Sequence, residues 1–177
     1  MMMKMNRKLL GAVALFAMFS AFEANAQQNL NVSATVPDVC VITTPGTDLN
    51  MLIDLSNMDT LPGPFTGTAS FLWRCSLGNA ATINIDSGGG TGATGATRFM
   101  IGPGGVGVDE LAYTLTTPAA ALWGNTANGQ PGLAVVGAGM GAGDEQTTVI
   151  TGTVLLADAE SSTAGAYNDT VIITLLP

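Results

Sequence analysis

Apolar and polar residues alternate with a period of two over most of the chain after residue 26, and helical periodicity is weak there. This alternation is typical of β-strands with one buried face. It predicts about seven or eight short strands, which favours a β-sandwich. Two of these strands are expected over residues 146–156 and 167–176. The apolar positions of the others are Leu30, Val32, Ala34 and Val36; Leu49, Met51, Ile53 and Leu55; Phe71, Trp73 and Cys75; Ala81, Ile83 and Ile85; and Leu111, Tyr113 and Leu115.

Glycine-rich stretches separate several of these segments, at residues 87–97, 101–108 and 137–143. Glycine loses much backbone entropy in regular structure, so such stretches are expected to be loops. The sequence contains no internal repeat and no interdomain linker. We therefore expect one all-β domain within residues 27–177.

The first 26 residues have the features of a secretory signal peptide. Basic residues at the start precede an apolar run over residues 9–22, and Ala24 and Ala26 form a small-x-small cleavage site. The apolar run is short for a membrane span, although an uncleaved anchor is the alternative. Cleavage after Ala26 leaves a mature chain that starts at Gln27.

Removal of this segment makes the chain more acidic. The mature chain keeps two basic residues, Arg74 and Arg98, and twelve acidic ones, so its net charge is −10 against −8 for the whole chain. Such a surface repels phosphate, which makes nucleic acids and anionic membranes poor partners. Solubility is the simplest reason for the negative charge.

Cys40 and Cys75 are the only cysteines, and the chain contains no histidine. In an exported protein two cysteines usually pair, and this pair would stabilise the fold by about 4 kcal/mol. Two buried free thiols are the alternative. The absence of histidine and of a C-x-x-C motif argues against a zinc or redox site.

Few residues suggest catalysis or ligand binding. Residues 102–107 match G-x-G-x-x-G, but the expected strand after them is not the helix that a dinucleotide loop requires. The acidic pairs Asp109-Glu110 and Asp144-Glu145 are read as solvated loop charge, with Ca²⁺ binding as the alternative. We expect no catalytic residue, no cofactor, no metal and no small-molecule substrate.

A set of residues from Cys40 onward resembles the spore coat protein U domain, the domain of archaic chaperone–usher pilus subunits. The most specific part is the ending Gly-x-Tyr-x-Asp-Thr-Val at residues 165–171. The chain departs from the family pattern after the first cysteine, where an expected Phe-Gly turn is missing, and at residues 150–154. The matching residues are Cys40, Cys75, Arg98, Tyr113, Trp123, Gly124, Gly165, Tyr167, Asp169 and Thr170.

The resemblance implies an immunoglobulin-like β-sandwich that lacks its final strand. In such families a periplasmic chaperone fills the gap, and the N-terminal segment of the next subunit then replaces it at an outer-membrane usher. Residues 27–37 are the candidate donor strand, because they alternate and carry no charge. Its inward side chains would be Leu30, Val32, Ala34 and Val36. An ordinary first strand of a complete sandwich is the alternative for this segment.

The function that we expect is therefore structural and not enzymatic. The chain would be exported through the periplasm and would join a surface pilus as a homo- or heteropolymer, for attachment and biofilm formation. Two alternatives remain: a secreted or coat-associated β-sandwich that folds alone, and an adhesin that binds a surface or a glycan.

Overall fold

The computed structural model describes residues 30–56 and 63–177. The chain divides into two compact units, Met1–Thr35 and Val36–Pro177, and the strands and helices described below lie in the second. The expected signal peptide over residues 1–26 lies outside the described residues. Within the described ranges, no helix is both long and apolar enough to cross a membrane.

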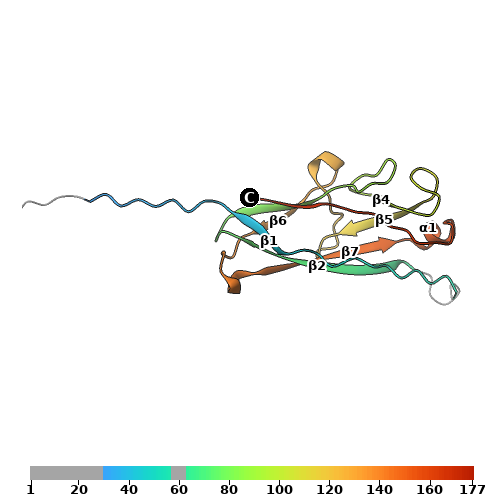
Figure 1. Cartoon of the computed structure of the whole chain (residues 1–177), viewed down its shortest axis with the longest axis horizontal. Helices are drawn as coiled ribbons and strands as arrows, with labels where there is room; N and C mark the ends of the chain where they lie inside the picture. The colour runs from blue at the N-terminus through green and yellow to red at the C-terminus, as the bar shows by residue number, and fades with distance from the viewer. Residues whose placement is uncertain (1–29, 57–62) are drawn as a thin grey trace, which may run out of the picture. The chain divides into compact units, whose positions relative to one another are not determined.

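Eight strands in the described part of the second unit form two antiparallel sheets (Figure 1). The five-stranded sheet has the order β1-β2-β7-β5-β4, and the three-stranded sheet has the order β6-β3-β8. The strands are β1 (Cys40–Thr44), β2 (Phe65–Cys75), β3 (Ala80–Ile85), β4 (Arg98–Ile101), β5 (Glu110–Thr116), β6 (Leu133–Val136), β7 (Gln146–Val154) and β8 (Ile173–Leu176).

The buried core lies between the two sheets, as the alternation predicts. Every second residue of β2 from Ala69 to Cys75 is buried, and in β3 Ala81, Ile83 and Ile85 are buried. Apart from Ala69, these side chains belong to one apolar cluster, to which β5 and β7 also contribute. The predicted all-β sandwich is therefore confirmed, and alternate positions define its inner face because side chains alternate across a strand.

The disulfide joins the first two strands of the larger sheet. Cys40 and Cys75 are bonded to each other and are opposite partners in the β1–β2 ladder. Trp73 shares the inner face of β2 with Cys75, and its indole nitrogen donates a hydrogen bond to Thr148 Oγ1 on β7 at 2.8 Å. A covalent bond and a buried hydrogen bond thus fix this end of the sandwich.

Three strand predictions need correction. Residues 30–36 and 49–55 form no strand, and the predicted last strand over 167–176 is shortened to β8. Alternation identifies which side chains can face a core, but a strand also needs a neighbour for its backbone hydrogen bonds, and these segments lack a ladder partner among the described residues. Leu49, Met51 and Ile53 nevertheless pack against the core.

Short helical segments were not predicted. The helix α1 (Leu156–Glu160) follows β7 directly, and the 3₁₀ segments η1 (Thr126–Asn128) and η2 (Ala142–Asp144) lie in loops. The glycine-rich stretches at 87–97, 101–108 and 137–143 connect strands, as predicted, except that Ile101 is the last residue of β4 and η2 begins in the third stretch.

Candidate functional site

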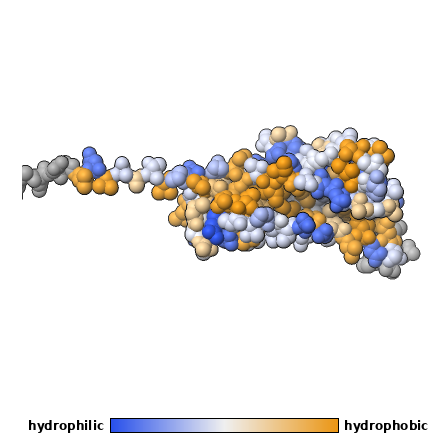
Figure 2. Space-filling model, viewed as in Figure 1, coloured by the Kyte–Doolittle hydropathy of each residue, from blue (hydrophilic) through white to orange (hydrophobic). Residues whose placement is uncertain are grey.

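An open groove of about 840 Å³ lies in the second unit. One side is formed by Ile42 and residues 45–51, and the other by residues 167–171 and Ile173. Figure 2 shows apolar residues, in orange, gathered over much of the visible face of this unit. Contiguous apolar surface of this kind marks a binding site more often than scattered apolar residues do.

The floor of the groove is the inner face of the larger sheet. Phe71 on β2, Ile150 on β7 and Leu115 on β5 line it, and all three belong to the buried core. The groove therefore opens directly onto the core of the sandwich. A ligand there would be in contact with aliphatic and aromatic side chains, which suits an apolar partner.

The first side of the groove exists because the chain leaves the sheet soon after β1. The β1–β2 register shifts between Ile42 and Thr44, and only a 3.4 Å hydrogen bond from Thr47 N to Ser70 O follows. A bulge of this kind bends a strand and can end its pairing. Residues 45–51 thus border the groove without adding a strand to the sheet.

Two glycines let this segment cross the inner face of the sheet. Gly67 and Gly152 are opposite partners in the β2–β7 ladder. A Cβ at Gly67 would collide with the carbonyl oxygen of Asn50, and a Cβ at Gly152 would lie 2.7 Å from Leu49 Cδ2. Isolated glycines in strands often mark such a close approach of another backbone segment. Gly67 and Gly152 could therefore have indicated this crossing from the sequence, but it was not predicted.

The second side of the groove ends in an unpaired strand edge. Among the described residues, β8 pairs with β3 alone. Asp86 N donates to Ile172 O at 3.1 Å. Because antiparallel pairing alternates along a strand, the backbone groups of Ile173 and Leu175 then point to the other edge. Such an edge can bind a further strand.

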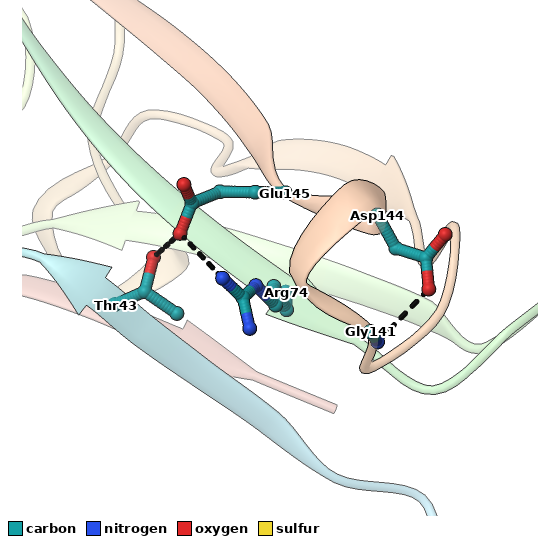
Figure 3. A network of polar contacts seen from close by, with 5 residues as sticks. All are labelled: Thr43, Arg74, Gly141, Asp144 and Glu145. Atoms are coloured by element: carbon teal, nitrogen blue, oxygen red, sulfur yellow. Dashed lines mark hydrogen bonds and ion pairs between the residues drawn. The ribbon is translucent and has the colours of Figure 1, made fainter.

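A polar network fixes β1 to its neighbours (Figure 3). Arg74 Nη2 on β2 lies 3.1 Å from Glu145 Oε1, and Thr43 on β1 donates its hydroxyl proton to the same oxygen. Both charged side chains are partly exposed, so the ion pair itself contributes no more than about 1 kcal/mol. Its geometric effect is to join β1, β2 and the start of β7. Asp144 instead accepts a hydrogen bond from Gly141 N at 2.9 Å.

Three of the family-motif residues meet beneath the β3–β4 loop. Arg98 is 0% exposed and donates to the carbonyl oxygens of Asp86, Gly95 and Trp123 at 2.8, 3.1 and 2.7 Å. Trp123 in turn donates from its indole nitrogen to Ile83 O at 2.8 Å. Gly124, the next residue, accepts a backbone hydrogen bond from Ile85 N and donates one to Pro131 O.

The role of this group is structural, because the guanidinium N–H groups of Arg98 donate to backbone carbonyl oxygens. Burial lowers the pKa of the Arg98 guanidinium, while the nearby Tyr113, Asp86 and Asp169 oppose that shift. A buried guanidinium that satisfies three carbonyls holds the β3–β4 loop in one conformation. Its position away from the groove lining leaves it no contact with a bound partner there.

A second group of motif residues lies at the groove itself. Tyr113 donates to Asp169 Oδ2 at 2.6 Å, and Asp169 Oδ1 accepts from Gly89 N and Thr170 N at 2.9 and 2.8 Å. Burial raises the pKa of Tyr113, and the hydrogen bond to Asp169 raises it further. Tyr113, Asp169 and Thr170 all line the groove.

Tyr167 continues this side of the groove. Its hydroxyl lies 2.5 Å from Asp109 Oδ1 and 2.8 Å from Thr163 O, and burial together with the Asp109 contact raises the pKa of Tyr167. Gly165 packs against Pro103, where a Cβ would collide with the proline ring. The motif at 165–171 thus shapes the chain that leads into β8.

The acidic pair Asp109-Glu110 is not the solvated loop charge that was expected, because Asp109 is 9% exposed and Glu110 begins β5. Asp109 contacts Tyr167, while Glu110 accepts from Thr91 N and Gly107 N, and these backbone hydrogen bonds lower the pKa of Glu110. Residues 102–107 form a turn before β5 and not the start of a helix. Across residues 30–56 and 63–177, no three His, Cys, Asp or Glu side chains cluster as metal ligands would.

The predicted donor segment exposes its apolar side chains to solvent. Leu30, Val32 and Val36 are 85%, 85% and 82% exposed, and Ala34 is exposed too. Residues 27–29 lie outside the described residues. Large apolar side chains that alternate and are this exposed leave a substantial apolar area in water.

Comparisons with known proteins agree with this fold. A family model described as the Spore Coat Protein U domain matches residues 26–174. The search of curated proteins finds no match.

Solved structures provide a second comparison. The chain is similar to part of the CsuC–CsuE chaperone–tip adhesion subunit pre-assembly complex from archaic chaperone–usher Csu pili of Acinetobacter baumannii, with 19% identity, a TM-score of 0.51 and coverage of 80% of this chain and 40% of that one. A chaperone–tip adhesin complex of CFA/I fimbriae gives 15% identity, a TM-score of 0.44 and coverage of 79% and 41%. The chain thus spans about two fifths of each matched chain. The first likeness shows a shared immunoglobulin-like fold.

Proposed function

The chain belongs to the spore coat protein U domain family, and we propose that it is a structural subunit of an archaic chaperone–usher pilus whose subunits join by donor-strand exchange. The observation that carries the proposal is the groove of about 840 Å³ that opens onto the core between residues 45–51 and the free edge of β8. A strand added there would extend the smaller sheet and cover the floor.

The N-terminal segment has the chemistry that this groove needs. Leu30, Val32, Ala34 and Val36 would face the floor, while Asn31, Ser33 and Thr35 would face outward. Burial of the leucine and the two valines contributes roughly 5–8 kcal/mol, at about 1.5–3 kcal/mol for each side chain. Backbone hydrogen bonds to the β8 edge add to this and set the register.

Charge supports the same pairing. The segment 27–37 contains no charged residue, and the groove lining contains only two, Asp48 and Asp169. Asp169 already accepts hydrogen bonds from Tyr113, Gly89 and Thr170. An uncharged strand can therefore enter without leaving a new charge unpaired.

This mechanism requires particular partners. An open apolar groove is a hazard in the periplasm, so a chaperone would cover it until a neighbouring subunit supplies its own segment. An outer-membrane usher would then pass the fibre to the cell surface. The chain acts there as a scaffold for attachment and biofilm formation, with no cofactor and no catalytic residue.

Deletion of residues 27–37 tests the donor role. The deleted chain should still bind the chaperone and accept a donor strand, but it should donate none. When mixed with the full chain, it should therefore shorten the fibres. A control in which Asn31, Ser33 and Thr35 are replaced by Ala keeps the inward set and should assemble normally. Fibres of ordinary length from the deleted chain alone would contradict the proposal.

Further outcomes separate the alternatives. A full chain that folds as a stable monomer without a chaperone and takes up no 27–37 peptide would support a self-contained sandwich. Loss of surface attachment with intact fibres would indicate an adhesin. Loss of both fibres and attachment after gene deletion is the result that the proposal expects.

A further inference from the structure

The residues that join the N-terminal segment to β1 are fixed by one buried serine. Ser76, which follows β2, donates its hydroxyl proton to Pro37 O at 2.9 Å and accepts from Val39 N at 3.1 Å. Ser76 N also donates to Val39 O at 2.9 Å. The serine is 8% exposed, so water competes little for these groups.

These contacts define the conformation of residues 37–39. The carbonyl groups of Pro37 and Val39 are two residues apart and both face Ser76, which is the arrangement of an extended chain. The pair Val39–Ser76 continues the β1–β2 ladder one step beyond the paired Cys40 and Cys75. Pro37 adds a further constraint because it holds Val36 away from the helical region.

An extended 37–39 prevents this linker from serving as a turn. The groove borders β1, so a segment that folded back into the groove of its own subunit would form a hairpin with β1. Its turn would fall at residues 37–39, which Ser76 holds straight. A turn placed earlier would consume Val36 and Ala34, two of the four inward residues.

Effective concentration makes this constraint important. A segment tethered by a short free linker reaches its own groove at an effective concentration of about 1 mM, far above the concentration of neighbouring subunits. Subunits closed on their own segment would then outnumber subunits that assemble, unless the geometry of the linker prevents closure.

We propose that Ser76, through Pro37 and Val39, is a latch that prevents self-closure and so directs the N-terminal segment to a neighbouring subunit. The inference rests on the proposed function and adds a positioning residue to it. Ser76 is not among the residues that line the groove. The two hydrogen bonds of the Ser76 hydroxyl are enough to shift the equilibrium between the extended linker and a freely turning linker by about tenfold.

The test uses the mature full chain, refolded with its disulfide intact and without a chaperone at low micromolar concentration. Three variants are compared with the unaltered chain. Ser76→Ala removes the hydroxyl, Ser76→Thr keeps it, and Ser70→Ala removes a hydroxyl in the middle of β2. Polymer is measured by size-exclusion chromatography, open grooves by uptake of a labelled 27–37 peptide, and the monomer by thermal melting.

The latch predicts an unusual combination for Ser76→Ala. Polymer yield and peptide uptake should fall about tenfold, while the melting temperature of the monomer should rise because its groove is filled by its own segment. Ser76→Thr and Ser70→Ala should behave like the unaltered chain. A purely structural role for Ser76 would instead lower the melting temperature and leave peptide uptake unchanged, and that result would overturn the proposal.

A second variant covers the case in which Ser76→Ala does not fold. A flexible Gly-Ser-Gly-Ser insertion between Val36 and Pro37 leaves Ser76 intact and supplies a free turn ahead of the latch, so it should also close on itself. If the insertion does not reduce peptide uptake, the latch proposal is contradicted but the proposed function is not. Failure of the unaltered chain to take up peptide or to polymerise would overturn the proposed function as well.

Discussion

Tyr113 and Asp169 are joined by a 2.6 Å hydrogen bond that connects β5 to the chain leading into β8. The two residues are 56 positions apart: Tyr113 lies on β5, and Asp169 lies in the loop before β8, next to Asn168, which bridges to Ile101 on β4. Because both line the groove, the bond fixes the second side of the groove to its floor. Two residues of the family motif therefore shape the surface on which a donor strand would lie.

Removal of this hydrogen bond should destabilise the domain. Tyr113→Phe leaves Asp169 with its two backbone donors but without the phenol, and hydrogen bonds to charged groups contribute about 1.5–3 kcal/mol. We expect the free energy of unfolding to fall by about 2 kcal/mol in urea titrations. Asp169→Asn, which keeps an acceptor oxygen, should lose less. An unchanged midpoint in Tyr113→Phe would show that the bond contributes nothing.

The raised pKa of Tyr113 predicts a loss of stability in alkali. Its folded-state pKa lies above the ordinary value of 10.0, so the folded protein holds this proton more tightly than the unfolded chain does. The stabilisation is fully present below pH 10 and is lost as the pH rises beyond it, with a slope of about 1.4 kcal/mol per pH unit. Short unfolding experiments between pH 9 and 12 should show this decline. The decline should be smaller in Tyr113→Phe, where Tyr167 alone remains, and an equal decline in both proteins would contradict the assignment.

The two arginines of the mature chain should respond differently to the same change. In Arg98 three different guanidinium nitrogens each donate to one carbonyl oxygen. The single ammonium nitrogen of Arg98→Lys cannot reach all three positions, and we expect a loss of about 3 kcal/mol. Arg74→Lys alters a partly exposed ion pair with Glu145 and should cost less than about 1 kcal/mol. Equal losses in the two variants, measured by denaturant titration, would show that burial of Arg98 does not matter.

The glycine pair on the inner face should be intolerant of a methyl group. Gly67→Ala places a Cβ against the backbone of Asn50, so residues 49–51 must shift, at a cost of about 1–3 kcal/mol. Gly143→Ala is a matched control, because a Cβ there meets nothing within 4 Å. We also expect Gly67→Ala to weaken uptake of the 27–37 peptide, since the displaced segment borders the groove. Normal peptide uptake by Gly67→Ala would show that residues 49–51 are not part of the peptide-binding site.

The sequence predicted β2, β3, β5 and β7, which both alternate and pair with neighbours. It did not predict β1, β4 and β6, because segments this short show no clear alternation. The inward positions of β2, β3 and β5 follow directly from alternation, because these strands lie between or beside others in a sheet. Residues 49–55 alternate as well, yet they form no strand. Alternation reports which face is apolar, whereas a strand requires a backbone partner, and that partner depends on the register of distant segments.

The site was predictable only in part, for a similar reason. The motif residues Tyr113 and Asp169 could be selected from the sequence, but their contact depends on how the loop before β8 packs against β5. The burial of Arg98 could not be inferred, since an arginine on a short strand is usually exposed. The role of Ser76 could not be predicted from the sequence, because it depends on two backbone groups that lie 37 and 39 positions away.

The central claim is that residues 27–37 fill the groove of a neighbouring subunit. It is tested most directly by two matched substitutions in the donor segment. Val32→Asp puts a charge on the inward face, where burial without a partner is strongly unfavourable. Ser33→Asp puts the same charge one residue away on the outward face. Both variants are expressed with the presumed chaperone, and subunit ladders are compared on unboiled gels.

The account predicts that Val32→Asp abolishes the ladder while Ser33→Asp leaves it intact, because a strand presents neighbouring side chains to opposite faces. Both variants should still bind the chaperone, since their own grooves are unchanged. A Val32→Asp ladder as long as that of the unaltered chain would contradict the account.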